Sequence, residues 1–297
     1  MPCSMSVVVI GQIGRDLVLR TDGPPASGES TKILRRDELL GGKGANQAVG
    51  LTQLGVPVAL LGVVGDDIAG TMVLQQAKAD GINTEGVVRR GTTALLIDIV
   101  GWGSERVLLE HVPQSSLVQV ADLDRSAALL EAADTVSIQL QQPPATALAA
   151  ASRARQQKVR VVADGAPPAD IQAELLASVN VLRADAAEAA LIAGADVTTV
   201  EQAESLGRTL LARGPELVAL AVPGVGDLLV WGEDSQLFEF SAVQVVDPTG
   251  AGDAFTAGLI AALRDGDGPR EAGRRAAAAA SSTVQRLGGR PNLSGCR

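Results

Sequence analysis

Short apolar runs rich in β-branched residues alternate along this 297-residue chain with Ala-rich stretches that suit helices. Four of these runs cover residues 58–64, 159–162, 179–182 and 217–222. Runs that are apolar throughout are typical of strands buried on both faces, and strands of that kind form parallel sheets between helices. The pattern predicts an α/β fold, a three-layer αβα sandwich with a mainly parallel central sheet. Its functional loops should gather at the carboxyl ends of the strands.

A second set of segments has a different pattern. Residues 16–21 and 30–36 mix apolar and polar side chains as half-exposed strands do, and residues 95–100 and 106–110 flank a hairpin-length turn at 101–105 that contains Trp102. These segments predict a small separate sheet, the lid, with strands from about 15–36 and 93–112. One domain that spans residues 1–297 and carries this lid fits a chain with 46% hydrophobic residues.

Charge and cysteine content exclude several classes of function. The net charge of −9 repels nucleic-acid phosphates and anionic lipid surfaces, and no block of Lys or Arg offsets it. The first apolar run ends at Gly11, far short of the roughly 20 residues that a membrane span needs. Cys3 and Cys296 lie at opposite ends, which argues against a disulfide framework. We expect a cytoplasmic protein that binds neither nucleic acid nor membrane.

The segment 247–255 reads Asp-Pro-Thr-Gly-Ala-Gly-Asp-Ala-Phe and joins a Gly-rich turn to an apolar helical run. Gly250 to Gly252 lie where a helix begins, and the first N–H groups of a helix lack partners and can hold an anion. Asp253 could accept a proton from a hydroxyl that faces a bound phosphate. The pattern predicts a phosphoryl-transfer site. The alternative is a Gly-rich loop with an acidic residue that merely favours the helix dipole.

A second Gly-rich segment, residues 41–48, reads Gly-Gly-Lys-Gly-Ala-Asn-Gln-Ala and also opens a helix, which should run to Leu54. Its paired glycines permit close backbone approach, while Lys43 and Asn46 supply donors and an acceptor. Multiple hydrogen bonds of this kind suit a polyhydroxylated ligand such as a sugar. The segment matches neither the Walker A order nor Gly-x-Gly-x-x-Gly.

Residues 41–48 and 247–255 together resemble the two signatures of the ribokinase-like (PfkB) carbohydrate kinases. The resemblance extends from the opening strand at 7–11 to the loop at 288–292. It implies an enzyme, an ATP-dependent carbohydrate kinase that phosphorylates a sugar hydroxyl, with D-ribose to ribose 5-phosphate as the leading reaction. The alternatives are another sugar or nucleoside kinase of the family, or a catalytically degenerate sugar or nucleotide sensor. Nucleoside kinases usually stack aromatic side chains on the base, and this chain has three Phe, two Trp and no Tyr.

The resemblance also implies roles in the sugar site. Asp253 would act as general base, and the amides of Gly250, Ala251, Gly252 and Asp253 would form the anion hole. The sugar would contact Asp16, Gly42, Lys43, Asn46, Gln141 and Asp253. Two positions depart from the ribokinase pattern, since Gly14 stands where Asn is usual and Gln141 where Glu is usual. Both changes touch the expected sugar pocket, so the acceptor sugar stays open.

On the nucleotide side, the family's Asn-x-x-Glu corresponds to Asp185-Ala186-Ala187-Glu188, and these two carboxylates would handle Mg²⁺; the alternative is a solvated helix start. The resemblance places the nucleotide against Asp185, Val222, Gly224, Gly226, Asp227 and Gly252. Val222 replaces a hydroxyl residue of the family. A monovalent cation, K⁺, would bind among Asp247, Thr249, Thr283, Arg286, Gly288 and Asn292. Asp247 alone is also compatible with a simple turn before Pro248. Family members often pair two lids, so we expect a homodimer.

Overall fold

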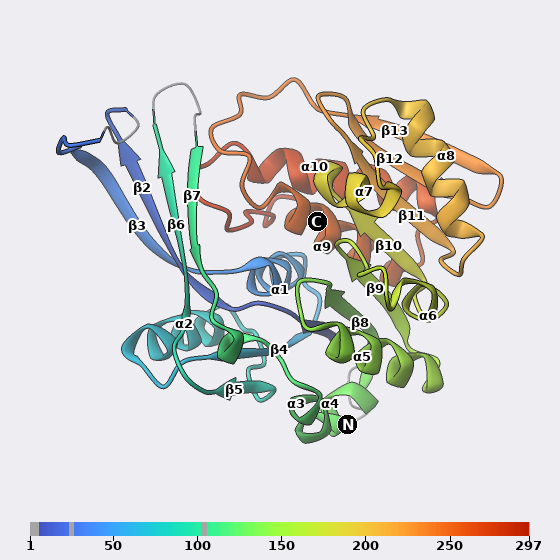
Figure 1. Ribbon diagram of the computed structural model, residues 1–297, viewed down its shortest axis with the longest axis horizontal. Helices are drawn as coiled ribbons and strands as arrows, with labels where there is room; N and C mark the ends of the chain where they lie inside the picture. The colour runs from blue at the N-terminus through green and yellow to red at the C-terminus, as the bar shows by residue number, and fades with distance from the viewer. Residues whose placement is uncertain (1–5, 24–26, 102–105, 297) are drawn as a thin grey trace.

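The computed structural model describes residues 6–23, 27–101 and 106–296 of the chain. Cys3, Trp102 and most of the turn expected at 101–105 lie outside these ranges. Within them, the main sheet has the strand order β13-β12-β11-β10-β9-β8-β1-β4-β5 (Figure 1). Its strands are β1 (Ser6–Ile10), β4 (Val58–Val64), β5 (Val87–Arg89), β8 (Ala133–Gln139), β9 (Arg160–Asp164), β10 (Val181–Ala184), β11 (Leu217–Val222), β12 (Gly226–Trp231) and β13 (Asp234–Glu239).

Every pairing from β5 to β11 in this sheet is parallel, and β12 and β13 add an antiparallel edge. The predicted apolar runs form its centre, and β4 and β11 begin and end where the sequence pattern places them. All seven residues of β4 are buried because helices cover both faces of the sheet. The mainly parallel sheet predicted from the sequence is confirmed.

Two groups of helices form the outer layers. One apolar core lies between the sheet and α1 (Lys43–Gln53), α2 (Ile68–Ala79), α9 (Ala251–Asp265) and α10 (Pro269–Thr283). The core on the other face involves α3 (Val120–Arg125), α4 (Ala127–Glu131), α5 (Pro144–Gln156), α6 (Gln172–Leu176), α7 (Ala186–Ala193) and α8 (Val200–Leu211). A 3₁₀ turn, η2, covers Gln114–Ser116. This arrangement is the predicted three-layer sandwich. None of the helices in the described part of the chain has the length and apolar character needed to span a bilayer.

A separate small sheet stands at one side of the sandwich (Figure 1). Its order is β3-β2-β6-β7, with β2 (Gly14–Thr21), β3 (Ile33–Gly41), β6 (Ala94–Val100) and β7 (Arg106–His111). The predicted small sheet is therefore present. Its strand β3 runs to Gly41, five residues beyond the expected end, and leads directly into α1. This connection places the first turn of α1 at the base of the lid.

Candidate active site

A polar cavity of about 340 Å³ lies between the lid, the first turns of α1 and α9, and the carboxyl ends of the central strands. The residues expected to contact sugar all line it, namely Asp16, Gly42, Lys43, Asn46, Gln141 and Asp253. Gly250, Gly252, Thr249 and Asp185 line it as well. Segments separated by more than 200 residues thus meet in one space.

The glycines before α1 give Asp16 its position. A Cβ atom on Gly41 would overlap the Asp16 carboxyl group, so only glycine at this position leaves room for the carboxylate. Gly42 caps α1 with a φ of 88°, in the left-handed region that favours glycine. Helix α1 begins at Lys43, earlier than a Gly-rich loop would suggest, so Lys43 and Asn46 project from its first turn.

Besides Arg183 Nε, three polar atoms of residues that line the cavity are buried without a hydrogen-bond partner among the described residues: Asp16 Oδ1, Asn46 Oδ1 and Gln12 Nε2. Buried polar groups in folded proteins are normally paired, so a set of unpaired ones that line one cavity points to a ligand. Two acceptors and one donor match the hydroxyls of a sugar, each of which can both donate and accept. Gln12 was not singled out from the sequence.

Asp253 lies in the first turn of α9 and is buried. Asn46 Nδ2 donates to its Oδ2 at 3.0 Å. Burial and the charge of Asp164 together raise the pKa of Asp253 to about 7, although Asn46, Lys43 and Arg183 act in the opposite direction. A carboxylate with a pKa near neutral pH is suited to accept a proton as a general base. Burial also raises the pKa of Asp16 to about 7, with contributions from Asp98 and Asp253.

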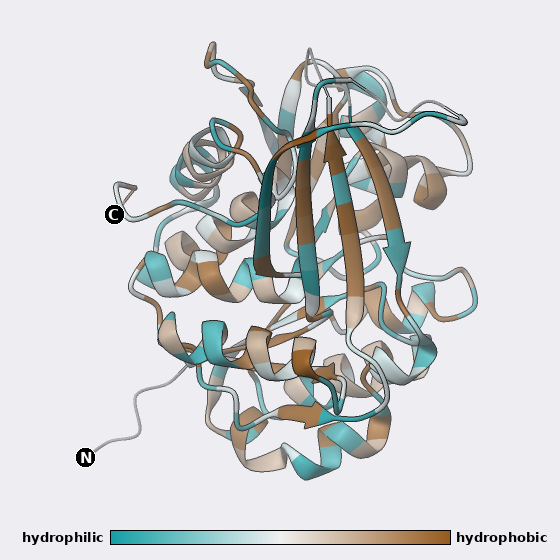
Figure 2. Cartoon of the chain, turned by 90° about the vertical axis from the view of Figure 1, so that its left-hand side faces the viewer, coloured by the Kyte–Doolittle hydropathy of each residue, from teal (hydrophilic) through white to brown (hydrophobic). Residues whose placement is uncertain are grey.

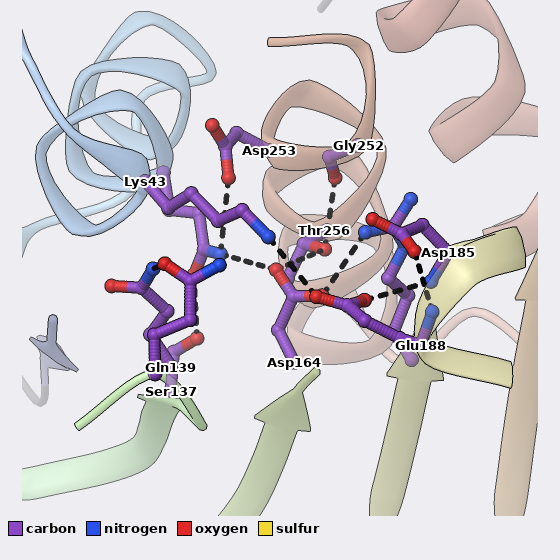
Figure 3. Close-up of polar contacts among 12 residues, drawn as sticks. Lys43, Ser137, Gln139, Asp164, Asp185, Glu188, Gly252, Asp253 and Thr256 are labelled. Atoms are coloured by element: carbon purple, nitrogen blue, oxygen red, sulfur yellow. Dashed lines mark hydrogen bonds and ion pairs between the residues drawn. The ribbon is translucent and has the colours of Figure 1, made fainter. Parts of the chain in front are cut away.

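A buried hydrogen-bond network lies beneath Asp253 (Figure 3). Asp164, the last residue of β9, accepts from Gln47 Nε2 at 2.6 Å and from Arg183 Nη1 at 3.1 Å. Ser137 Oγ in turn donates to Gln47 Oε1 at 2.9 Å. Asp164 and Arg183 were missed by sequence reasoning. The available signal was a charged residue at the carboxyl end of an apolar strand, which in this fold class marks a functional edge.

Asp185 and Glu188 form a capping box at the start of α7, in which each side chain accepts from the backbone N–H of the other. Lys43 Nζ also lies 3.0 Å from Glu188 Oε1. Burial lowers the pKa of Lys43, but the nearby carboxylates of Glu188, Asp164 and Asp253 raise it by more, so the amine is charged. Asp185 and Glu188 therefore do stabilise a helix start, as the alternative interpretation of this pair expected. Mg²⁺ needs few protein carboxylates beside nucleotide phosphates and waters, and Asp185 lines the cavity where it could supply one.

The lid contributes residues to the cavity that the sequence did not indicate. Asp98 on β6 and Arg106 on β7 form an ion pair of 2.5 Å, and both line the cavity together with Glu110. Leu96 lies on the same side, and a Cβ atom on Gly14 would come within 2.8 Å of its Cδ1. The departure at Gly14 thus has a packing reason. Beside the cavity, Gln141 Oε1 accepts from Gln139 Nε2 at 2.9 Å.

A second cavity, of about 320 Å³, lies on the other side of the start of α9. Its lining is mainly apolar and includes Phe238, Phe240, Val243, Val245, Ala277, Ala280 and Val284. Asp227 and Gly252, both expected near the nucleotide, line it too. Val222 is fully buried in β11 and does not line this cavity, and Gly224 and Gly226 lie in the adjoining turn and at the start of β12.

The segments expected to hold a monovalent cation lie side by side. The carboxylate of Asp247 is buried and accepts from the N–H of Thr249 and of Gly288, each at 2.9 Å. The N–H of Arg286 donates to the carbonyl of Thr283 at 3.4 Å, and Arg286 Nη2 lies 3.0 Å from the side-chain amide of Asn292. Asp247 thereby ties the turn before α9 to the segment after α10. Its turn role and the expected cation role are compatible.

Comparison with known proteins identifies the class. The family model described as pfkB family carbohydrate kinase matches residues 4–295, so the chain belongs to this family. It is 27% identical over 290 residues to the ribokinase of Haemophilus influenzae, covering 97% of this chain and 95% of that one. The crystal structure of the ribokinase from Thermotoga maritima superposes with a TM-score of 0.82 at 26% identity, covering 96% and 95% of the two chains. The Arabidopsis thaliana ribokinase complexed with ribose and ATP gives 0.79 at 26% identity, covering 96% and 94%. The protein is thus a ribokinase-like sugar kinase.

Proposed function

We propose that residues 1–297 act as one kinase domain that transfers a phosphoryl group from ATP to a pentose, with D-ribose to ribose 5-phosphate as the leading reaction. The observation that carries the proposal is the position of Asp253. This buried carboxylate, with a pKa of about 7, lies in the first turn of a helix without a side-chain cap and borders a cavity with unpaired sugar-type donors and acceptors. The relative complexed with ribose and ATP supports the same pair of substrates.

The polar cavity supplies the acceptor side of the reaction. Asp16, Asn46 and Gln12 would bind the sugar hydroxyls and direct one hydroxyl toward Asp253. Asp253 would take the proton of this hydroxyl while its oxygen attacks the γ-phosphate. The backbone amides of residues 250–253 would hold the negative charge of the transferred group, because donors at a helix start are oriented before the reaction begins.

The apolar cavity supplies the donor side. Its Phe, Val and Ala side chains suit the flat face of a nucleotide base, and Asp227 at its edge suits the more polar part of the nucleotide. Mg²⁺ near Asp185 and Glu188 would neutralise phosphate charge. K⁺ beside Asp247 and the segment 283–292 would add positive charge behind the anion hole.

The outer face of the lid supports a homodimer. Side chains alternate along its strands, so Arg106, Leu108 and Glu110 line the cavity while Val107 and Leu109 point outward and are exposed. Hydrophobic stretches run along the lid strands in the view of Figure 2. A second lid that packs on this face would cover it and protect the exposed edge strand β7. Because the reaction consumes ATP, the proposed location is the cytoplasm.

The test is ADP release from ATP, Mg²⁺ and K⁺ with a panel of ribose, deoxyribose, fructose, other pentoses and nucleosides. Ribose-dependent turnover is the expected result. Turnover on another acceptor would instead trace specificity to Gly14 and Gln141 and select the alternative family kinase. A protein that binds sugar in the presence of ATP but releases no ADP would be a sensor.

The cation is tested by the same assay in potassium and in a tetramethylammonium buffer of equal ionic strength. A higher rate in potassium is expected. Identical rates would remove K⁺ from the proposal while leaving the sugar kinase reaction in place.

A further inference from the structure

Arg183 lies between the two cavities and lines both of them. It projects from β10, and its side chain is 8% exposed. The guanidinium rests against the first turn of α9, since a Cβ atom on Gly252 would come within 2.5 Å of Arg183 Nη2. Arg183 therefore lies where groups held in the two cavities would meet.

The positive charge of Arg183 is only partly paired. Nη1 donates to Asp164 Oδ1 at 3.1 Å, and Gln47 donates to the other oxygen of this carboxylate. Arg183 Nε is buried and has no hydrogen-bond partner among residues 6–23, 27–101 and 106–296. Burial lowers the pKa of Arg183, yet the carboxylates of Asp164, Asp227 and Glu188 raise it above its ordinary value. The guanidinium is charged at every working pH and retains an unused donor.

The first turn of α9 adds a second positive group beside the guanidinium. The start of a helix carries partial positive charge, so a buried cation beside the start of α9 opposes the helix dipole. No side chain caps α9. The guanidinium and the first turn of the helix thus face the same place, where one anion could accept from both. Mutual repulsion between them becomes joint attraction when a group with several negative oxygens enters.

We propose that Arg183 is a catalytic residue that donates to an oxygen of the phosphoryl group during its transfer. The proposal rests on the kinase reaction proposed above. In that step the bond between the γ-phosphorus and the bridging oxygen of ATP breaks, and this oxygen leaves with the electron pair as part of ADP. The sugar oxygen forms the new bond to phosphorus, and its proton passes to Asp253. Arg183 keeps all its protons and stabilises the charge on the equatorial oxygens.

Arg183 could also have a purely structural role, the neutralisation of Asp164. A matched pair of variants distinguishes this role from the catalytic one. Arg183→Met alone leaves the buried carboxylate of Asp164 unpaired and can fail to fold. The double variant Arg183→Met, Asp164→Asn removes both charges. Compared with the single variant Asp164→Asn, it differs by the guanidinium alone. Thermal unfolding of both proteins shows that each is folded before rates are compared.

The measurements are kcat, the KM values for sugar and ATP, and the affinity for ADP with and without tetrafluoroaluminate in the presence of sugar. Relative to Asp164→Asn, the double variant should lose about 10²- to 10³-fold in kcat and should no longer bind ADP more tightly when tetrafluoroaluminate is added. Its KM for sugar and its affinity for ADP alone should change by less than about threefold.

Equal kcat values in the two variants would overturn the proposal, as would a loss confined to the affinity for ADP, which would assign Arg183 to nucleotide binding alone. Failure of the proposed function is a separate result. In that case the wild-type protein releases no ADP with any acceptor, whereas an active wild type with two equally active variants refutes the role of Arg183 alone.

Discussion

The two cavities on either side of the start of α9 differ in the polarity of the side chains that line them. The polar cavity is lined by Asp16, Asp98, Glu110 and Asp253, and several buried polar atoms of its lining residues have no hydrogen-bond partner among the described residues. The apolar cavity presents mostly Phe, Val and Ala side chains, and the carboxylates among its lining residues are Asp227 and Glu239. Hydrogen-bonding walls reject a ligand that lacks the matching group far more strongly than apolar walls do. The polar cavity should therefore set acceptor specificity, and the apolar cavity should bind its nucleotide with less discrimination.

The largest effect is expected at Asp253, where the polar cavity meets the anion hole. Asp253→Asn keeps the shape and the hydrogen bond from Asn46 but removes the base, so kcat should fall by about 10²- to 10⁴-fold. The KM for sugar should change little, because Asp16 and Asn46 remain. Steady-state kinetics of the variant test this, with thermal unfolding as the control for folding. Activity near that of the wild type would exclude Asp253 as the general base.

The fold could be predicted from the sequence more fully than the site. Apolar β-branched runs become strands buried on both faces, so the positions of β4 and β11 follow from composition alone. The motif at 41–48 predicts that a helix opens there, but not its first residue, because glycine is a poor helix former and Gly44 lies in the first turn of α1. Gly44 is retained there because a Cβ atom would overlap the backbone of Gly11 on the neighbouring connection. Tertiary packing decides this boundary.

The candidate site was predictable where its residues lie in continuous motifs, as Asp253 and Lys43 do. Asp164 is the last residue of β9 and Arg183 the last but one of β10, and their ion pair depends on these strands being neighbours in the sheet. Strand order is a long-range property that a local sequence pattern does not contain. The same holds for Asp98 and Arg106, which meet across a lid hairpin and reach the cavity because of the lid's orientation. The place of these residues in the site could be recognised only from the structure.

A second prediction contrasts ligand binding in the two cavities. Asp16→Ala removes a buried carboxylate with an unpaired oxygen, and hydrogen bonds to charged groups are worth about 1.5 to 3 kcal/mol. The KM for sugar should rise by roughly 10- to 150-fold, with the KM for ATP within about threefold of the wild type. Kinetics with each substrate varied at saturating levels of the other give both values. Equal increases in the two KM values would show that the cavities are not separate binding sites.

The contrast also extends to the pH dependence of stability. The pKa of Asp16 and of Asp253 is about 7 in the folded protein, against 3.8 for an ordinary Asp, so between pH 4 and 7 the folded state holds protons that the unfolded chain has released. The free energy of unfolding should therefore fall as pH rises through this window, by up to about 4 kcal/mol for each carboxylate.

Urea unfolding at several pH values without ligand measures this slope. Asp16→Asn should flatten it more than Asp227→Asn does, since the pKa of Asp227 rises only to about 6 in the apolar cavity. The opposite order would mean that the pKa of Asp227, in the apolar cavity, is raised more than the pKa of Asp16. A bound sugar should also flatten the slope, because its hydroxyls hydrogen-bond to the charged form of Asp16.

The smallest effect is expected from the apolar cavity. Phe240 lines it and is 57% exposed, so Phe240→Ala removes one stacking surface without opening the core. An aromatic contact is worth about 0.5 to 1.5 kcal/mol, so the KM for ATP should rise by roughly 2- to 12-fold with the KM for sugar unchanged. GTP in place of ATP should be affected in the same proportion, because apolar walls do not read the base edge. A large selective loss with one nucleotide would mean that this cavity, too, discriminates through a polar contact, and the contrast between the two cavities would then be one of degree.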